Sequence, residues 1–427
     1  MSRLTKTKEE DSALAPWLAR RASGDRCARC GACLSFCPVY QAVPIERYSP
    51  RGKNFLLRTA DIKKKQRLIK QTVTACLQCG ACSTLCGSGA DVAALIREER
   101  AKSSYFQSLP HSLFSLWEKL GQERSAKAAT LLKKISPILK DLHETITLSD
   151  RPFLSHLDHF QGVTSGLTPL VEAKEELDLS KVLFFTGCVQ NFVLPETAAK
   201  VASFLGWKAH IPREQSCCGL PAYSQGAIKQ ARAFAKRNIL LFRDYDFHTL
   251  VTGCASCAYM IRKWPLLFPQ EDSLYPLAKE ISQRVMELSQ FVVSNYCARH
   301  DFAATNGHDT GTTICQIPCH QLYGLSSAHT PKEAAAMALG TGLHQESLGC
   351  CGLGGTFSLL NPDISKEIFK RNIRGQIERL SLKEPTRIIT TCSGCLLRLS
   401  KGVQGRESGS RLKISHLVEV LMEKQTH

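Results

Sequence analysis

The chain has 427 residues, 20 cysteines and a formal net charge of +17, and 43% of its residues are hydrophobic. This length predicts two to four domains of roughly 100–200 residues each. The hydrophobic content is that of a globular protein. Cysteines clustered at short spacings in so long a chain favour metal ligation over disulfides. The positive charge lacks an accompanying aromatic–basic motif, so it favours an acidic partner or an anionic membrane surface over nucleic acid.

Residues 1–25 are charged and form an N-terminal lead-in. They lack the apolar core of a signal peptide, so no export signal is expected. No run in the chain approaches 18 consecutive apolar residues, so no membrane-spanning helix is expected either. We therefore expect a cytoplasmic protein. If it associates peripherally with a membrane, the inner face of the cell membrane is the expected place.

Residues 26–100 contain eight cysteines in two copies of one motif. In each copy, two residues separate the first three cysteines, and three residues separate the third from the fourth. The first copy ends in Cys37-Pro38 and the second in Cys86-Gly87. The members are Cys27, Cys30, Cys33 and Cys37, then Cys76, Cys79, Cys82 and Cys86.

This spacing is typical of [4Fe–4S] binding, because three thiolates on one tight loop can hold three corners of a cluster. The fourth cysteine usually ligates the other cluster in a two-cluster protein. We therefore predict one cluster on Cys27, Cys30, Cys33 and Cys86, and a second on Cys76, Cys79, Cys82 and Cys37. Because CxxC pairs also bind zinc, a structural zinc pair is the alternative.

Residues 101–180 contain no cysteine and are expected to form a helical linker, with apolar residues three and four positions apart in 111–120 and 125–142. The remaining chain contains an internal repeat, whose first copy we place at 181–300 and its second at 310–427. Each copy alternates β-rich and helical runs, which predicts βαβ units around a parallel sheet.

Each repeat also carries five cysteines in the same order: one alone, then an adjacent pair followed by glycine, then a CxxC pair. The first set is Cys188, Cys217, Cys218, Cys254 and Cys257, and the second is Cys319, Cys350, Cys351, Cys392 and Cys395. The single cysteine and the CxxC pair follow β-rich runs, and ligands of parallel sheets gather at the carboxyl ends of the strands. We therefore expect each set to bind metal at one sheet edge. The alternatives are a structural role, zinc or no ligand.

This double repeat resembles the cysteine-rich CCG domain of heterodisulfide reductase, of lactate-utilisation protein A and of two iron–sulfur subunits. The two iron–sulfur subunits are those of glycolate oxidase and of anaerobic glycerol-3-phosphate dehydrogenase. The order of motifs resembles the whole-chain layout of the glycolate oxidase, glycerol-3-phosphate dehydrogenase and heterodisulfide reductase D types over about residues 20–425. The segment between the N-terminal motifs, with Ser-Pro-Arg-Gly-Lys-Asn at 49–54, resembles the α-helical ferredoxin domain of respiratory dehydrogenases. Its alternative interpretation is a turn that begins a helix.

The resemblance implies an α+β multidomain fold, in which an α-helical ferredoxin domain with two [4Fe–4S] clusters precedes two α/β CCG domains. In heterodisulfide reductase, intact five-cysteine motifs bind noncubane [4Fe–4S] clusters. Both motifs are intact here, so one or two further clusters are expected.

The chain shows no GxGxxG fingerprint after a strand and no P-loop, so it should bind neither flavin nor NAD. It needs an FAD-containing partner to take a hydride. The resemblance then implies an iron–sulfur electron-transfer subunit of a flavin-linked 2-hydroxyacid (glycolate or D-lactate) dehydrogenase, with a quinone, cytochrome or other acceptor. The alternatives are a heterodisulfide reductase-type thiol–disulfide oxidoreductase subunit and a glycerol-3-phosphate dehydrogenase-type subunit.

Two cysteines fall outside every motif. Cys297 stands alone and Cys315 lies four residues before Cys319, too far along a strand to share its small cluster. Both are predicted to be buried apolar residues. His320 and Tyr223, which lie next to motif cysteines, are expected either to gate the sites or simply to pack.

Overall fold

The computed structural model describes residues 26–59, 66–102, 149–298, 312–340, 343–344, 348–380, 386–403 and 412–424. The two helices expected at 111–120 and 125–142 lie outside the described residues, as does the lead-in.

In residues 26–100, expected from sequence to form the ferredoxin-type domain, every regular element that the structure describes is a helix. These helices are η2 (Ala32–Leu34), α3 (Pro38–Ala42), η3 (Glu46–Tyr48), α4 (Pro50–Thr59), α5 (Gln66–Thr74), α6 (Ala81–Thr84) and α7 (Val92–Lys102). The run at 49–54 explains where α4 begins: Ser49 accepts a hydrogen bond from Gly52 N at 2.9 Å, and Pro50 suits the first helical position. Position 52 requires glycine, because a Cβ there would lie 2.0 Å from the Glu46 carbonyl oxygen.

The first repeat contains a three-stranded parallel sheet in the order β3-β4-β5, formed by β3 (Val182–Phe184), β4 (Thr249–Thr252) and β5 (Val285–Glu287). Leu183 is opposite Leu250, and Thr252 is opposite Glu287. The helices are α12 (Gly187–Phe192), α13 (Pro195–Phe204), α14 (Leu220–Ser224), α15 (Ile228–Phe242), α16 (Ala255–Arg262), η7 (Trp264–Leu267), α17 (Tyr275–Arg284) and α18 (Leu288–Asn295).

The second repeat contains a four-stranded parallel sheet in the order β10-β9-β7-β8. Its strands are β7 (Thr312–Gln316), β8 (Leu343–His344), β9 (Thr386–Thr390) and β10 (Leu412–His416). Its helices are η8 (Gln321–Leu325), α19 (Thr330–Leu339), α20 (Phe357–Leu360), α21 (Pro362–Phe369), η9 (Lys370–Arg374), α22 (Gly375–Arg379), α23 (Ser393–Val403) and α24 (Leu417–Leu421). The predicted βαβ architecture with parallel sheets is therefore confirmed in both repeats.

The described end of the expected helical linker is only partly helical. It contains η5 (Phe153–Ser155), α11 (Leu157–Val163), β1 (Leu167–Pro169), β2 (Val171–Ala173) and η6 (Leu179–Lys181). Strand β1 pairs antiparallel with β11 (Met422–Lys424), and β2 pairs antiparallel with β6 (Tyr296–Ala298). These strands form against partners more than 100 residues away, so the local periodicity that predicts helices does not reveal them.

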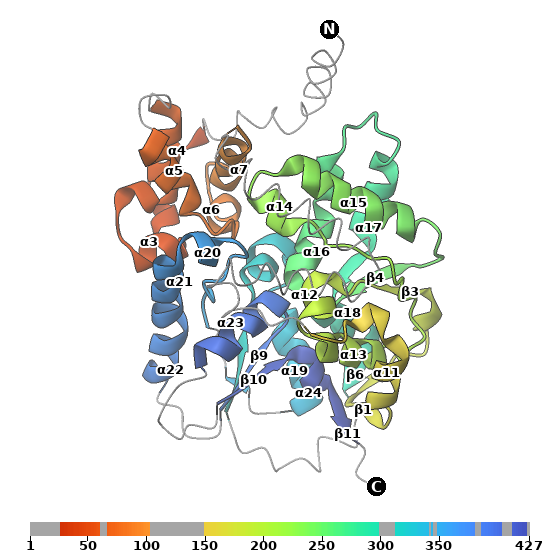
Figure 1. Cartoon of the computed structure of the whole chain (residues 1–427). Coiled ribbons are helices and arrows are strands. Elements are labelled where there is room, and N and C mark those ends of the chain that lie inside the picture. Colours follow the sequence, from red (N-terminus) through yellow and green to blue (C-terminus); the bar gives the residue numbers. More distant parts are fainter. Residues whose placement is uncertain are drawn as a thin grey trace.

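The three parts of the molecule share hydrophobic cores. Phe234 and Trp264 of the first repeat belong to the same buried cluster as Ile388 and Leu399 of the second. A smaller cluster joins the ferredoxin-type domain to the second repeat; its members include Val39, Leu77, Phe357 and Ile368. Helices α3–α7 accordingly lie beside α20, α21 and α14 in Figure 1. Within the described ranges, no helix is both long enough and apolar enough to cross a bilayer.

Candidate iron–sulfur sites

The two N-terminal motifs form loops of the same conformation. The residue before the second cysteine, Arg29 in one loop and Gln78 in the other, has φ 57°, and the glycine after it, Gly31 or Gly80, has φ 83°. A left-handed backbone at a residue other than glycine costs of order 1–3 kcal/mol and tends to persist at functional sites. The repeated conformation is what two copies of one ligand-binding loop require.

The loop of the second motif forms a recess together with the last cysteine of the first motif. The recess has an empty volume of ≈ 400 Å³, and its lining includes Cys37, Cys76, Cys79 and Cys82. These are the four cysteines predicted from sequence to share one cluster. Lys53 also lines the recess and donates a hydrogen bond from Nζ to the Ala75 carbonyl oxygen at 2.5 Å.

The electrostatics of this recess favour the thiolate form at one of its four cysteines. Burial raises the pKa of Cys37, Cys79 and Cys82. Burial also acts on Cys76, but the positive charges of Lys53 and Arg100 outweigh it and lower the pKa of that thiol. A metal deprotonates its thiol ligands outright. Four thiols facing one space, with a buried ammonium among them, therefore fit a cluster held by four thiolates.

The loop of the first motif is more exposed. Cys30 is exposed, whereas Cys27, Cys33 and Cys86 are half-buried. The loop after Cys86 lies beside this motif, because a Cβ placed on Gly89 would be 3.7 Å from Nη1 of Arg26. Cys86 Sγ accepts a hydrogen bond from Ala90 N at 3.3 Å. Although burial opposes it, hydrogen bonding from Ser88 and backbone amides gives this thiol a lowered pKa.

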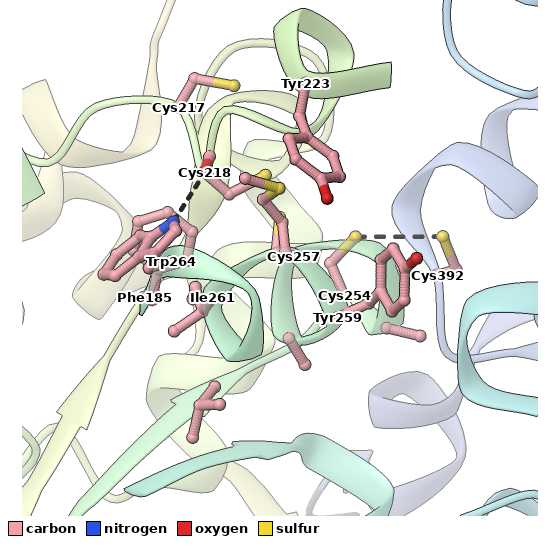
Figure 2. Packing of buried hydrophobic residues seen from close by; sticks show 14 of the residues in the cluster. Phe185, Cys217, Cys218, Tyr223, Cys254, Cys257, Tyr259, Ile261, Trp264 and Cys392 are labelled. Carbon is pink, nitrogen blue, oxygen red and sulfur yellow. Dashed lines mark hydrogen bonds between the residues drawn. The ribbon is translucent and has the colours of Figure 1, made fainter. Parts of the chain in front are cut away.

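The five cysteines of the first repeat converge at the carboxyl end of its sheet. Cys188 lies in α12, the adjacent pair precedes α14, and Cys254 is the N-cap of α16. Cys188 Sγ donates to Cys217 Sγ at 3.5 Å, and Trp264 Nε1 donates to the Cys218 carbonyl oxygen at 3.0 Å (Figure 2). The hydrogen bonds from its neighbouring thiols hold the pKa of Cys217 well below its usual value.

The second repeat gathers its five cysteines in the same way. Cys351 and Cys395 have their sulfur atoms 3.2 Å apart, and Cys350 Sγ accepts a hydrogen bond from Gly352 N at 3.4 Å. Hydrogen bonds from Cys254 and Cys395 hold the pKa of Cys392 well below its usual value. The first repeat thus has one thiol with a lowered pKa, and the second has two, because a hydrogen bond from Cys319 also lowers the pKa of Cys350.

These sites lie next to one another across domain boundaries. Cys254 of the first repeat and Cys392 of the second have their sulfur atoms 3.9 Å apart (Figure 2). After burial, the largest influence on the pKa of the Cys79 thiol is the charge of Cys350 in the second repeat, which raises it further. The thiol sites therefore follow the order ferredoxin-type domain, second repeat, first repeat, although the ferredoxin-type domain also contacts the first repeat directly, where Arg100 donates to the Ser224 carbonyl oxygen.

His320 connects the same three parts. Its Nδ1 is 2.9 Å from Ser256 Oγ, which in turn is 3.2 Å from Cys392 Sγ. Its Nε2 is 3.4 Å from the Gln78 carbonyl oxygen, and its ring stacks on Tyr259 at a centroid distance of 4.5 Å. His320 is thus a buried residue that packs between the loop of the second motif in the ferredoxin-type domain and the two repeats.

Tyr223 also packs at a domain boundary, because the Arg97 guanidinium lies 4.6 Å from the centroid of its ring.

The two cysteines outside the motifs behave differently from each other. Cys315 is fully buried in β7, as predicted. The prediction for Cys297 is wrong, because this residue is exposed in β6. Side chains alternate along a strand, and in this two-stranded ribbon Tyr296 points into the core, so its neighbour points outward.

Sequence reasoning missed the role of two buried cations. Lys53 lies within the 49–54 run that resembles the α-helical ferredoxin domain, and that run is the signal that could have marked it. Arg100 is 1% exposed and donates to the carbonyl oxygens of Val73, Cys76 and Ser224. No sequence pattern marks Arg100, since all these partners are backbone atoms. In the part of the chain that the structure describes, no group of three or more His, Cys, Asp or Glu side chains has the geometry of a single metal-ion site.

The fold and the thiol clusters define an iron–sulfur protein with repeated cysteine-rich domains. Residues 23–90 match the family described as "4Fe-4S dicluster domain", and residues 182–262 and 314–400 each match "Cysteine-rich domain". The chain therefore belongs to the CCG-domain iron–sulfur subunit family, and iron–sulfur clusters are its cofactors.

Some similar proteins align with nearly the whole chain, and others align with about half of it. A Bacillus subtilis protein named "Probable glycolate oxidase iron-sulfur subunit" is 23% identical over 433 residues, covering 94% of both chains. "Lactate utilization protein A" of Geobacillus kaustophilus is 31% identical over 250 residues, which cover 56% of this chain and 98% of the relative. The protein of the same name from Oceanobacillus iheyensis is 26% identical over 246 residues, covering 56% of this chain and 96% of the relative.

Proposed function

We propose that this chain is the iron–sulfur electron-transfer subunit of a flavin-linked 2-hydroxyacid dehydrogenase for glycolate or D-lactate. An FAD-containing partner oxidises the acid, and this chain passes the electrons to a quinone, cytochrome or other acceptor. The observation that carries the proposal is the series of thiol sites, which runs from exposed Cys30 to the pair Cys254 and Cys392. The names of the relatives support the substrate class.

The assignment of ligands stays as the spacing predicts it, and the recess around Cys37 supports the crossed arrangement. When bound, the clusters would supply one-electron redox chemistry. The protein's own side chains place the thiols, exclude water from the inner recess and set the charge around it through Lys53 and Arg100.

Reconstitution with the partner tests this function. The anaerobically purified chain alone should not reduce an artificial dye with glycolate or D-lactate, because it is expected to bind no flavin. A complex with its FAD-containing partner should do so, and should also reduce the clusters of this chain. Turnover of either acid by the chain without flavoprotein would contradict the subunit assignment.

Iron content tests the number of sites separately. Two clusters in the ferredoxin-type domain require about eight irons, and occupancy of both repeats raises the total to about sixteen, at four irons per cluster. Substituting Cys217 and Cys218 with serine should remove about four irons and leave the second repeat filled. A total of about eight that these substitutions do not change would mean that the repeats are structural.

Disulfide reduction is the second candidate, because two complete five-cysteine sites meet at Cys254 and Cys392. Protein reduced by a viologen dye should then reduce an organic disulfide in the absence of any flavoprotein. Equal rates with wild-type protein and with a Cys392→Ser variant would exclude this candidate.

A further inference from the structure

The outer loop, residues 26–36, and the inner loop, residues 75–82, have the same backbone turn but opposite surroundings. In the inner loop, Leu77 and Gln78 are buried, and Gln78 contacts His320 of the second repeat. In the outer loop, Arg29 and Cys30 are exposed. The outer loop is therefore the part of the ferredoxin-type domain where a redox partner can come close to a motif cysteine.

One face of α4 extends the surface of this loop. Arg51, Phe55 and Arg58 lie three or four positions apart and so share a side of the helix. The guanidinium of Arg29 lies over the ring of Phe55, 5.1 Å from its centroid. A Cβ on Gly31 would lie 2.7 Å from Nη1 of Arg51. The outer loop and this side of α4 therefore form one continuous surface.

This surface combines positive charge with exposed apolar area. Besides the buried Lys53, residues 26–59 contain five basic side chains and one acidic side chain, Glu46, which is paired with Arg51 at 2.7 Å. Phe55 is 46% exposed. Among the described residues, four of the seven large hydrophobic side chains that are exposed belong to the ferredoxin-type domain; these four are Phe36, Ile45, Phe55 and Leu85. Exposed apolar groups rimmed by charge mark interaction sites.

We propose that this face, formed by Arg26, Arg29, Arg51, Phe55 and Arg58 around Cys30, is the docking surface for the electron-donating flavoprotein. The matching face of the partner is an apolar centre within an acidic rim. The inference rests on the proposed function for the identity of the partner, and on the charge and exposure of this face for its location. Redox encounters use small interfaces, and complementary charge speeds association more than it tightens binding.

A membrane surface fits this face less well. The exposed cysteine lies within the charged patch, which suits a partner that must approach a redox site. Lipid headgroups exchange no electrons, so at a bilayer only a quinone acceptor would gain from that proximity. We therefore assign the face to a protein.

Electron transfer from a defined acidic flavoprotein tests the assignment. The probe is photoreduced flavodoxin, mixed in a stopped-flow instrument with cluster-loaded, oxidised full-length protein at low and high salt. The second-order rate constant should fall with salt, because exposed charges are screened within about 10 Å at 0.1 M. Arg29→Glu combined with Arg58→Glu should lower it about tenfold or more at low salt, within the range of electrostatic steering.

Matched variants separate docking from misfolding. Arg29→Gln is expected to fold normally, since Gln78 occupies the same turn of the inner loop; it should show a smaller loss. Lys279→Glu changes an exposed lysine on α17, on the opposite side of the molecule from α4 (Figure 1), and should leave the rate unchanged. Phe55→Ser should slow transfer without altering its salt dependence. Each variant must keep the iron content of wild-type protein.

Three results would overturn the proposal. One is an unchanged rate in the Arg29→Glu and Arg58→Glu double variant, and another is an equal loss in Lys279→Glu. In the third, wild-type protein floats with vesicles of phosphatidylserine and phosphatidylcholine and the double variant does not, while the two proteins accept electrons from flavodoxin at equal rates. The last result would reassign the face to membranes. Failure of the proposed function has a different signature, in which the charge effects persist but no flavoprotein couples 2-hydroxyacid oxidation to this chain.

Discussion

Glu287 and His416 hold equivalent positions in the two repeats. Each follows a strand at the sheet edge and caps the next helix, since Glu287 accepts a hydrogen bond from Ser289 N and His416 from Val418 N. Each also reaches the other repeat. Gln321 Nε2 donates to Glu287 Oε2 at 3.0 Å, and His416 Nε2 donates to the Gly253 carbonyl oxygen at 2.8 Å. An acid and a base thus link the repeats from both sides.

Burial shifts these two groups in opposite directions. It raises the pKa of Glu287 to about 7 and lowers that of His416 to about 4. The folded state binds the Glu287 proton more tightly than the unfolded state, so that contribution to stability is lost as pH rises from 4.5 to 7. The folded state disfavours the His416 proton, so its contribution is lost as pH falls from 6.5 to 4.

The first prediction concerns their variants. The two slopes oppose each other between pH 4.5 and 6.5, so Glu287→Gln should leave His416 unopposed and make stability rise with pH there. Conversely, His416→Asn should make stability fall as pH rises. Each shift corresponds to roughly 3 kcal/mol at most.

Thermal melts of anaerobic protein from pH 4.5 to 6.5 would measure both trends, with wild-type protein as the flat reference. Parallel curves for all three proteins would show that neither group changes its protonation in this range.

At the scale of single elements, helix α7 holds the inner loop, residues 75–82, in place through hydrogen bonds to its backbone. Arg100 on this helix donates to the carbonyl oxygens of Val73 at the end of α5, Cys76 of the inner loop, and Ser224 of α14. Its burial lowers the pKa of the guanidinium to about 10, yet the group remains charged at neutral pH. One side chain therefore holds together the recess and the first repeat.

Replacing Arg100 with methionine should cost about 3 kcal/mol or more, because it leaves several buried carbonyl oxygens without donors. Loosening Cys76 should also release the inner cluster, about four irons. Chemical denaturation and iron assays of anaerobic protein would measure both effects. Arg67→Met is the control, because it removes an exposed arginine from neighbouring helix α5. Full iron content in Arg100→Met would show that the loop does not depend on this helix.

The sequence predicts features well where they depend on local spacing, such as the cysteine motifs and the alternating strands and helices. It predicts them less well where they depend on pairing with distant parts of the chain. The cysteine intervals implied which thiols could share a site; Cys37, Cys76, Cys79 and Cys82 do line one recess, and their sharing of one cluster stays a prediction. The alternating runs predicted the parallel sheets. By contrast, β1 and β2 form on strands far along the chain, and exposed Cys297 belongs to one of those pairings. Glu287 and Arg100 matter through contacts between domains, which no local pattern records.

At the scale of the whole molecule, the order of sites in space differs from their order in the chain. The ferredoxin-type domain packs on the second repeat through Thr84, which donates to the Tyr323 carbonyl oxygen at 2.7 Å, and through Asn361, which donates to that of Thr74 at 3.0 Å. This packing places Cys79 close to Cys350. Cys392 of the same repeat then faces Cys254 of the first. The thiols of the second repeat therefore lie between those of the other two parts, although the first repeat also contacts the ferredoxin-type domain directly through Arg100 and Ser224.

The last prediction follows from this order and assumes that both repeats bind clusters. Replacing Cys351 and Cys395 with serine should remove about four irons from the second repeat and also slow the reduction of the first repeat from the N-terminal end, because the intermediate site is gone. Replacing Cys217 and Cys218 should remove the same amount of iron from the first repeat and leave reduction of the second unaffected. Freeze-quench paramagnetic resonance after mixing with photoreduced flavodoxin would follow each site. Equal rates in the two variants would mean that electrons reach the first repeat by a route that bypasses the second.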